Sequence, residues 1–474
     1  MSTLSSDLVS VAPLAIVACT GLVVLVVESL RHETELLNCW ISVVGLCAAL
    51  VTGFVTMGNA GTAFSGMLRT GGYASFFAVL FSLSGLLSVL LSQSYIRKEA
   101  IEHGEYYALV LFAVAGMMTM AAAADLVAFF LGLEIMSVCF YVLAGFARRR
   151  LSSNEAALKY FLLGAFATGF LLYGIALIYG STGTTAIARI LQSAAGQTGN
   201  PIFVIGVALL LIGLLFKVAV VPFHMWVPDV YEGAPTTITA FMSTGGKAAA
   251  FSVFLIIFVP GLLAAVSPLR QVLALLAALT MVVGNIIAIV QTSIKRMLAY
   301  SSIAHAGYIL TGVIAANSYG QNGILYYLLA YTVMNIGAFG ILSLLEDADG
   351  AGLTFTDYAG LSKRQPLLAG LMALFMFSLS GIPPFAGFFG KYYVFAGAIS
   401  AGYTWLAILG VLMSAVSAYY YLRVVVVMYF SEGSGARDVR LSPLGIAAVI
   451  VSALAILELG LFPSTVLNLT MRFF

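Results

Sequence analysis

Long apolar runs recur along this chain of 474 residues, and they limit its possible folds more than any other feature. A helix needs about 20 mostly apolar residues to cross the roughly 30 Å of hydrocarbon in a bilayer. Measured by that length, the sequence predicts fourteen spans: 8–28, 38–58, 73–93, 106–122, 124–146, 159–181, 201–222, 236–260, 271–291, 299–316, 323–345, 366–400, 403–430 and 442–464. We therefore predict an all-α polytopic membrane protein.

Two of the spans contain helix breakers. The run 366–400 is too long for one ordinary span and holds Gly381, Pro383 and Pro384 at its middle. The seventh run meets Pro222 and then continues as Phe-His-Met-Trp. Proline cannot continue an α-helix without losing a backbone hydrogen bond, and membrane proteins tolerate such breaks only inside a bundle. The sequence thus predicts that helices 7 and 12 are discontinuous.

The composition agrees with a membrane location and excludes several classes of function. Hydrophobic residues make up 62% of the chain and charged residues 8%, whereas soluble domains carry roughly 25% charged residues. A net charge of +2 with scattered basic residues does not indicate a nucleic-acid partner. The four cysteines lack CxxC spacing, and neither a pair of haem-ligating histidines nor a GxGxxG loop after a strand is present. We expect no cofactor and no metal in this chain.

Lysine and arginine are unevenly distributed between alternate loops, which predicts the orientation in the membrane. Five of the 21 basic residues fall within predicted spans, and only four lie in the loops on the side of the termini. The other loops hold twelve: Arg31, Arg97, Lys98, Arg148, Arg149, Arg150, Lys295, Arg296, Lys363, Arg364, Arg437 and Arg440. The rule places these loops in the cytoplasm and both termini on the opposite side of the membrane.

Several ionisable residues fall inside predicted spans. Lys247 lies eleven residues into its span, and Glu134 lies at the middle of another. Lys217 precedes Pro222 by five residues, and Lys391 follows the Pro-Pro pair by seven. A charge at the centre of a bilayer costs about 2.5–3.5 kcal/mol on insertion scales, so such residues usually face the bundle interior and have a function. The alternative, a lysine whose ammonium reaches the interface, stays open, most of all for Lys159 and Arg423.

Lysine, glutamate and histidine suit proton transfer. Burial favours the neutral form of a lysine, and a nearby carboxylate favours the charged form, so moving a counter-charge can load or release a proton. Glu134 is the natural counter-charge for Lys217. His224, beside the first break, and His305 are further candidates because imidazole exchanges protons near neutral pH. A hydrogen-bonded structural histidine is the alternative at both positions.

Three segments carry a resemblance to a known family. Residues 217–229 read KVAVVPFHMWVPD, and the chain continues through YEGAPTTITAF at 231–241. Residues 295–308 read KRMLAYSSIAHAGY, and residues 380–391 read SGIPPFAGFFGK. These motifs resemble the antiporter-like membrane subunits of respiratory complex I and of multisubunit cation/proton antiporters. The segment after residue 230 resembles the N subunits of bacterial NADH:quinone oxidoreductase in particular, and the match covers essentially the whole chain.

The resemblance implies a domain organisation and a role for each matching residue. It implies N-terminal helices 1–3 in 1–105, inverted five-helix repeats in 106–260 and 271–430, and helix 14 in 442–474. It further implies that Glu134 and Lys217 form a coupling pair, that Lys159 and Lys247 continue a hydrophilic axis, that His305 bridges two half-channels and that Lys391 exchanges protons with the periplasm.

The resemblance also implies that this chain is a non-redox subunit of a proton-translocating enzyme. NADH, flavin and iron–sulfur clusters would reside in partner subunits, and quinone would bind outside this chain. Its partners would be other membrane-arm subunits, especially the antiporter-like subunit M and the small subunits K and J.

Two alternatives remain open from the sequence. A subunit of a multisubunit cation/proton antiporter would share the fold and the lysines, although GAPTTITAF at 233–241 argues against it. A scaffold that does not pump would have no reason to bury Lys217, Lys247 and Lys391. Protons are favoured over sodium because the spans are rich in lysine and poor in carboxylates.

Overall fold

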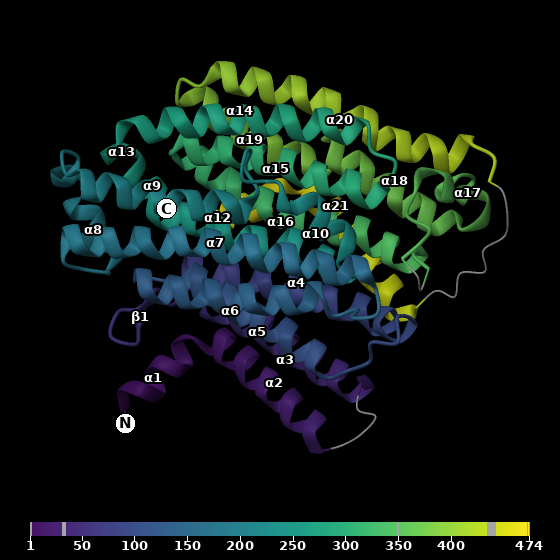
Figure 1. Cartoon of the computed structure of the whole chain (residues 1–474), viewed down its shortest axis with the longest axis horizontal. Coiled ribbons are helices and arrows are strands. Elements are labelled where there is room, and N and C mark those ends of the chain that lie inside the picture. The colour runs from purple at the N-terminus through teal and green to yellow at the C-terminus, as the bar shows by residue number, and fades with distance from the viewer. Residues whose placement is uncertain (1, 31–34, 348–349, 434–441, 472, 474) are drawn as a thin grey trace.

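The computed structural model describes residues 2–30, 35–347, 350–433, 442–471 and 473, and this part of the chain is almost entirely helical. Figure 1 shows the long helices lying side by side in one bundle, with both chain ends toward its left side. Thirteen helical stretches in the described residues are long and apolar enough to cross a membrane, and α18 (Pro366–Ser380) is a shorter apolar helix. Since α18 and α19 (Ala386–Ser400) make one interrupted span, the prediction of fourteen spans is confirmed.

The N-terminal part contains a small β-hairpin among helices. It comprises α1 (Ser2–Ser10), α2 (Ala12–Leu30), α3 (Glu35–Thr56), β1 (Gly61–Ala63), β2 (Leu68–Thr70) and α4 (Gly72–Lys98). The strands pair antiparallel, with Gly61 opposite Thr70. Helix α2 leaves most of its surface exposed at the lower edge of the bundle in Figure 1, whereas α4 is largely buried.

The next group of helices includes the first break. It comprises α5 (Glu105–Ala122), α6 (Leu126–Ala144), α7 (Leu151–Thr182), α8 (Ile187–Ser193), η1 (Ala194–Gln197), α9 (Pro201–Val218), α10 (Trp226–Gly233), α11 (Thr236–Phe241), η2 (Met242–Gly246), α12 (Lys247–Val253), η3 (Phe254–Leu262) and α13 (Leu263–Ala265). The segments from α11 to α13 form one span, in which η2 and η3 are π-helical.

The third group of helices includes the second break. It comprises α14 (Ser267–Ile289), α15 (Ile294–Ala315), α16 (Ser318–Leu345), η4 (Phe355–Tyr358), α17 (Leu361–Arg364), α18, α19 and α20 (Thr404–Phe430). Helices α21 (Pro443–Leu461) and α22 (Pro463–Thr470) follow. In the most apolar 18-residue stretch of α15 and of α16, 94% of the residues are buried, so these two helices form the centre of the protein.

Each break follows a residue in the left-handed backbone conformation. Helix α9 is followed by its C-cap residue Ala219, with φ of 63°, and Pro222 prevents the helix from resuming at once. Helix α18 is followed by its C-cap residue Gly381, with φ of 87°, before Pro383 and Pro384. The prediction that helices 7 and 12 are discontinuous is therefore confirmed, and each break leaves backbone carbonyls of a helix end inside the bundle.

The expected position of two basic residues is wrong. Lys295 and Arg296 were expected in a loop, but they lie in the first turn of α15, which the N-cap Ser293 starts earlier than hydropathy indicates. Lys295 is fully buried, and its ammonium donates a hydrogen bond to the Ala234 carbonyl at 2.7 Å. Likewise α7 begins at Leu151 and not at 159, so Lys159 lies about two turns inside the helix.

Candidate functional site

Lys247 lies near the centre of the bundle and is 2% exposed. Its ammonium donates hydrogen bonds to the carbonyl and, at 2.5 Å, to the hydroxyl of Ser302 on α15. It also lies 5.7 Å from the centre of the Tyr331 ring on α16. Lys247 immediately follows the π-helical turn η2, where a Cβ added to Gly246 would approach Phe140 to 2.7 Å. Close packing thus requires glycine beside this lysine.

His305 is 1% exposed and bonded through both ring nitrogens. Its Nδ1 lies 2.7 Å from the Tyr327 hydroxyl, and its Nε2 lies 3.0 Å from the Tyr421 hydroxyl. Its ring centre lies 5.0 Å from that of Tyr331 and 5.7 Å from that of Tyr308. Since Tyr331 also contacts Lys247, one ring separates the lysine from the histidine.

Lys391 lies in α19 and turns back toward the broken end of α18. Its ammonium donates hydrogen bonds to the carbonyls of Leu379 at 3.1 Å and Ser380 at 2.8 Å, and to the Ser414 hydroxyl at 2.8 Å. The Tyr308 ring centre is 5.1 Å away. Lys391 also lines a cavity of about 680 Å³ between α19 and α20.

These contacts form a continuous chain through the second half of the protein, which we call the central relay. It consists of Lys247, Tyr331, His305, Tyr308 and Lys391, in that spatial order. The chain comes from four different helical segments, so folding brings together residues that are up to 144 positions apart in the sequence. Every member of the relay is an amine, a phenol or an imidazole, and each of these groups can take part in proton transfer.

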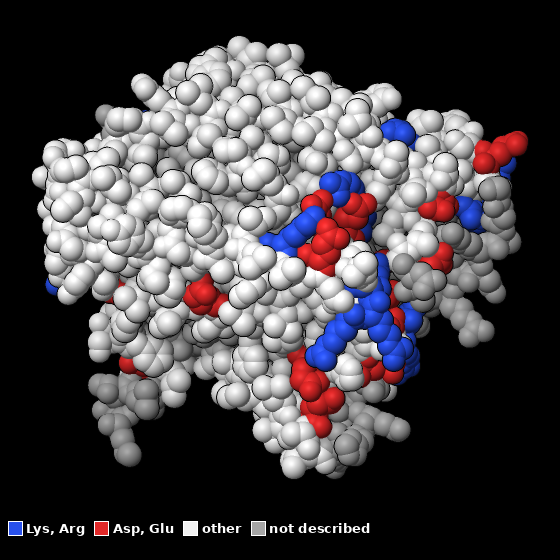
Figure 2. Space-filling view, in the orientation of Figure 1, with Lys and Arg blue, Asp and Glu red and all other residues white. Residues whose placement is uncertain are grey.

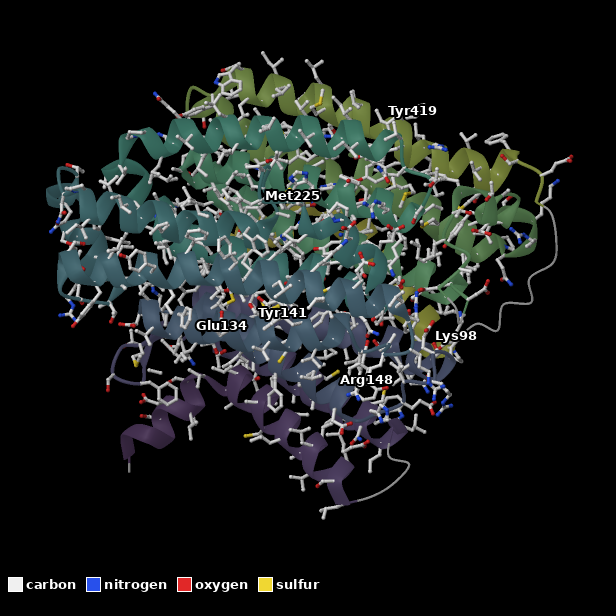
Figure 3. The ribbon with its side chains drawn as sticks, viewed as in Figure 1. Lys98, Glu134, Tyr141, Arg148, Met225 and Tyr419 are labelled. Carbon is white, nitrogen blue, oxygen red and sulfur yellow. The ribbon has the colours of Figure 1, made fainter. Side chains whose placement is uncertain are left out.

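Lys217 forms a separate site in the first half. Its ammonium donates hydrogen bonds to the hydroxyls of Ser137 at 2.8 Å and Tyr141 at 3.4 Å, both on α6. Glu134 lies one helical turn before Ser137, and Figure 3 labels it with Tyr141 along α6. No ion pair within 4.0 Å joins Glu134 to Lys217, and one buried Glu134 oxygen, Oε1, has no hydrogen-bond partner in the described part of the chain. Glu134 and Lys217 are thus not joined by an ion pair in this structure.

Aromatic rings extend from Lys217 toward the centre. The Lys217 ammonium lies 5.9 Å from the centre of the Tyr160 ring, which stacks on Trp226 at 4.5 Å. Trp226 in turn meets Tyr231 edge-on at 6.0 Å, and Tyr231 is buried. The two lysine sites are therefore separated by packed aromatic side chains of α7 and α10.

Lys159 lies apart from the buried lysines, in a half-exposed charged cluster. Its ammonium pairs with Glu155 and with Asp229, each at 2.7 Å, and Asp229 also pairs with Arg296 at 3.0 Å. Arg296 pairs with Glu232 at 2.5 Å, and these side chains line a cavity of about 220 Å³. Figure 2 shows charged side chains gathered toward one end of the helix bundle, with most of this face uncharged.

His224 occupies the break between α9 and α10 and is partly buried. Its Nδ1 is buried without a hydrogen-bond partner among the described residues. It contributes no bond to the central relay or to the Lys217 site. No group of three or more His, Cys, Asp or Glu side chains that could hold a metal ion occurs in the described ranges.

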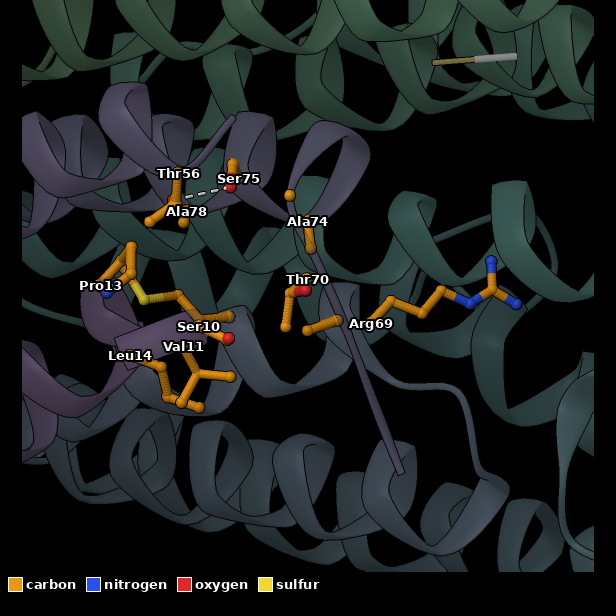
Figure 4. Close-up of a pocket in the computed structure, with 13 residues that line it drawn as sticks. Ser10, Val11, Pro13, Leu14, Thr56, Arg69, Thr70, Ala74, Ser75 and Ala78 are labelled. Carbon is orange, nitrogen blue, oxygen red and sulfur yellow. Dashed lines mark hydrogen bonds between the residues drawn. The ribbon is translucent and has the colours of Figure 1, made fainter. Parts of the chain in front are cut away.

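The cavity drawn in Figure 4 lies away from these lysines. It measures about 30 Å³ and lies between the N-terminal helices and the β-hairpin, beside the 3.0 Å hydrogen bond of Thr56 and Ser75. Its lining includes Arg69 and otherwise small, apolar or hydroxyl-bearing residues. It therefore holds at most a water molecule or two.

Sequence reasoning found the lysines but missed their hydroxyl partners. Tyr308, Ser301 and Ser302 stood in the quoted motif around His305, so their proximity to it could have been anticipated from helical spacing. Tyr327, Tyr331 and Tyr421 belong to helices α16 and α20, and only the tertiary fold reveals their contacts with His305. These tyrosines carry no local signal because tyrosine is common in apolar spans.

Comparisons with known proteins agree with this geometry. Residues 123–417 match the family model described as NADH:quinone oxidoreductase/Mrp antiporter, TM. The NADH-quinone oxidoreductase subunit N of Trichlorobacter lovleyi is 51% identical over 90% of this chain and 89% of the relative. Subunit N 1 of Chloroherpeton thalassium is 47% identical over 98% of both chains.

Solved structures give the same result. A chain of respiratory complex I from Thermus thermophilus superposes with a TM-score of 0.84 at 37% identity, covering 97% of this chain and 99% of its own. A chain of the Mrp complex from Dietzia shares the fold, with a TM-score of 0.87 at 23% identity, covering 99% and 97%. The chain therefore belongs to the antiporter-like family of NADH:quinone oxidoreductase and Mrp membrane subunits, among the N subunits of NADH-quinone oxidoreductase.

Proposed function

We propose that this chain translocates protons as the N subunit of a bacterial NADH:quinone oxidoreductase, and that it carries no redox chemistry of its own. The observation that carries the proposal is the central relay. Its two lysines and its histidine are almost completely buried, and each contacts the next through one tyrosine ring. Buried ionisable groups in membrane spans are costly unless they serve an ion pathway.

The surroundings of the lysines favour protons as the transported ion. The ammonium of Lys247 is bonded to Ser302 and has no acidic partner within 4.0 Å in the described chain. A lysine with neutral partners can lose its proton at moderate cost, because its neutral form keeps hydrogen bonds while the charged form lacks a counter-ion. Sodium prefers several oxygen ligands, and an ammonium in the same place would repel it.

The remaining roles belong to the same proposal. Glu134, one helical turn before Ser137 on α6, would modulate the charge of Lys217. Lys159 and its ion pairs would stand at the entrance of the first half, and Lys391 would release protons. NADH, flavin and iron–sulfur clusters would be held by partner subunits of the complex. Subunits M, K and J would be the nearest membrane-arm partners.

The proposed orientation places both termini on the periplasmic side of the bacterial inner membrane. The basic loops that follow α4, α6 and α16 then face the cytoplasm, as the positive-inside rule requires. The cavity beside Lys391 supports a role in release, because it offers space next to the last lysine of the relay.

The test is NADH-driven proton uptake by membrane vesicles that contain the complex with Lys247→Ala or Lys247→Arg. Both should lower NADH oxidation and proton uptake together by at least about tenfold, which equals about 1.4 kcal/mol of activation free energy. Arginine keeps the charge but does not release its proton, so it tests proton exchange and not charge alone. Assembly is verified on a native gel. Normal activity of both variants in an assembled complex would favour a scaffold without a pumping role.

A further inference from the structure

A second buried charge cluster lies outside the central relay, where α4 and α16 end and α7 begins. Arg150, the N-cap of α7, extends between two carboxylates. Its Nη1 lies 3.3 Å from Glu99 Oε2 at the end of α4, and its Nη2 lies 3.2 Å from Glu346 Oε1 at the end of α16. One guanidinium thus joins two acids from different parts of the chain. We call Glu99 and Glu346 the acid pair.

Both acids are buried and incompletely bonded. The Glu346 side chain is 0% exposed and that of Glu99 is 2% exposed, compared with 15% for Arg150. Glu99 Oε1 and Glu346 Oε2 are buried and have no hydrogen-bond partner in the described part of the chain. A buried carboxylate oxygen without a partner is costly, and two negative charges that share one cation repel each other. A proton bound to either acid would reduce both costs.

Other charged groups surround the pair. Lys98 and Tyr95 on α4 and Lys295 on α15 interact electrostatically with both acids. Asp347 after α16 acts in turn on Lys98, and Glu232 on α10 acts on Lys295. Burial raises the pKa of the Glu99 carboxyl, Arg150 lowers it, and Glu346 raises it again, with a net upward direction. Glu99 therefore binds a proton more readily than an exposed glutamate.

A row of hydroxyls leads from this cluster toward Lys247. The Tyr95 hydroxyl accepts hydrogen bonds from Arg150 Nη1 at 3.1 Å and from the Thr236 backbone N–H at 3.3 Å. Ser92, Ser88 and Ser84 follow at intervals of three or four residues, so they share one face of α4. All three are 0% exposed.

Hydroxyls of neighbouring helices bond to Ser92 and Ser84, whereas the Ser88 hydroxyl has no hydrogen-bond partner in the described part of the chain. The Tyr106 hydroxyl on α5 bonds with Ser92 at 2.8 Å and with Thr237 at 3.0 Å. Ser84 bonds with Thr244 at 3.0 Å, and Thr244 stands three residues before Lys247. Buried hydroxyls that both donate and accept therefore recur from the acid pair to the first lysine of the central relay.

We propose that Glu99 and Glu346 form a proton-binding site that supplies Lys247 from the cytoplasmic side. The inference rests on the proposed function. A carboxylate oxygen takes a proton from water, the neutral acid passes it to the hydroxyl row, and the site returns to its charged form. Arg150 positions both acids. Its positive charge also favours the deprotonated carboxylates, so that a bound proton can leave again. In this arrangement the acids exchange protons, and Tyr95, which accepts from Arg150, lies three residues from Ser92 along α4.

The experiment replaces Glu346 with glutamine and, separately, with aspartate, and measures NADH-driven proton uptake by vesicles between pH 6 and pH 8. Glutamine keeps the size of the side chain and its bond from Arg150 but cannot exchange a proton. We expect Glu346→Gln to lose activity several-fold at pH 8 and less at pH 6, where protons are more abundant. Glu346→Asp should retain most activity with the wild-type pH profile. The control is Glu102→Gln, whose acid is 32% exposed and pairs with Arg97, and which should match the wild type.

Three outcomes would overturn the inference. They are full activity of Glu346→Gln in an assembled complex, a loss that does not change with pH, and equal losses in the glutamine and aspartate variants. The last two would assign the acids a structural role in joining α4, α7 and α16. Lys247→Ala, measured in parallel, separates this failure from that of the proposed function, because a silent Lys247→Ala would remove the relay itself.

Discussion

The two broken helices carry their lysines on opposite sides of the break, and the lysines find different partners. Lys217 lies in α9, before the break, and binds side-chain hydroxyls of α6. Lys391 lies in α19, after the break, and binds two carbonyls at the end of α18. At the first break, the carbonyl of Phe216 near the end of α9 accepts a hydrogen bond from the Trp226 indole N–H at 3.0 Å and not from a lysine.

This difference indicates how each lysine is controlled. The carbonyl end of a helix carries partial negative charge. Backbone carbonyls do not gain or lose protons, so the electrostatic partner of Lys391 is constant. Lys217 instead binds neutral hydroxyls, and Glu134 lies one turn before Ser137 on α6. We infer that Lys217 is the adjustable site and Lys391 the constant one, next to the cavity that would receive its proton.

Removal of the adjustable lysine should have the largest effect. Lys217→Ala, in an assembled complex, should lower NADH oxidation and proton uptake by at least about tenfold, or about 1.4 kcal/mol. The reason is that no other described lysine contacts Ser137 and Tyr141. Both rates are measured in the same vesicles. Wild-type rates, with assembly verified on a native gel, would remove Lys217 from the proton path and end the comparison.

Loss of the adjustable charge should come next. Glu134→Gln keeps the shape of the side chain but removes its negative charge, and we expect about a fivefold loss, or about 1 kcal/mol. Glu105→Gln, an exposed acid in the first turn of α5, is the matched control. If both glutamine variants pump normally, the charge of Glu134 has no influence on Lys217. Lys217 would then not be the adjustable site.

The hydroxyl partners of the two lysines should then differ in importance. Ser137→Ala leaves Lys217 with Tyr141 at 3.4 Å alone, whereas Ser414→Ala leaves Lys391 with two carbonyls. A typical intramolecular hydrogen bond contributes about 0.5–1.5 kcal/mol net, so a partial loss of about threefold, or about 0.7 kcal/mol, is expected for Ser137→Ala. Ser414→Ala should lose less than about twofold.

Proton uptake by the two assembled variants measures this contrast directly. A larger loss of proton uptake in Ser414→Ala than in Ser137→Ala would contradict this expectation. It would mean that the carbonyls at the end of α18 do not hold Lys391 by themselves. Equal losses would mean that both lysines depend on their hydroxyl partners to the same extent.

The fold was accessible from the sequence because hydropathy and proline act locally. Fourteen spans and both breaks could be predicted from run length and from Pro222, Pro383 and Pro384. Span ends were less accessible, since polar side chains can lie inside a helix when a neighbour satisfies them. Lys295 is the clearest example, because the Ala234 carbonyl that binds it lies just after the end of α10, far away along the chain.

The site was only half accessible. A lysine in an apolar run draws attention by its cost, but Tyr331 and Tyr421 cost little in a membrane helix and carry no such signal. The same holds for Glu99 and Glu346, which stand at helix ends where an acid is expected to be solvated. Their burial follows from the packing of α4, α7 and α16 and could not be deduced from spacing along the chain.

The smallest effect should come from a lysine outside both sites. Lys363 lies in the short helix α17 and is exposed, so its charge is solvated and contributes little to a buried pathway. Lys363→Ala should change proton uptake and NADH oxidation by less than about twofold. This corresponds to about 0.5 kcal/mol, the usual limit for a surface substitution. A loss as large as that of Lys217→Ala would mean that removal of any lysine disturbs the complex, and burial would no longer distinguish the lysines that carry protons from those that do not.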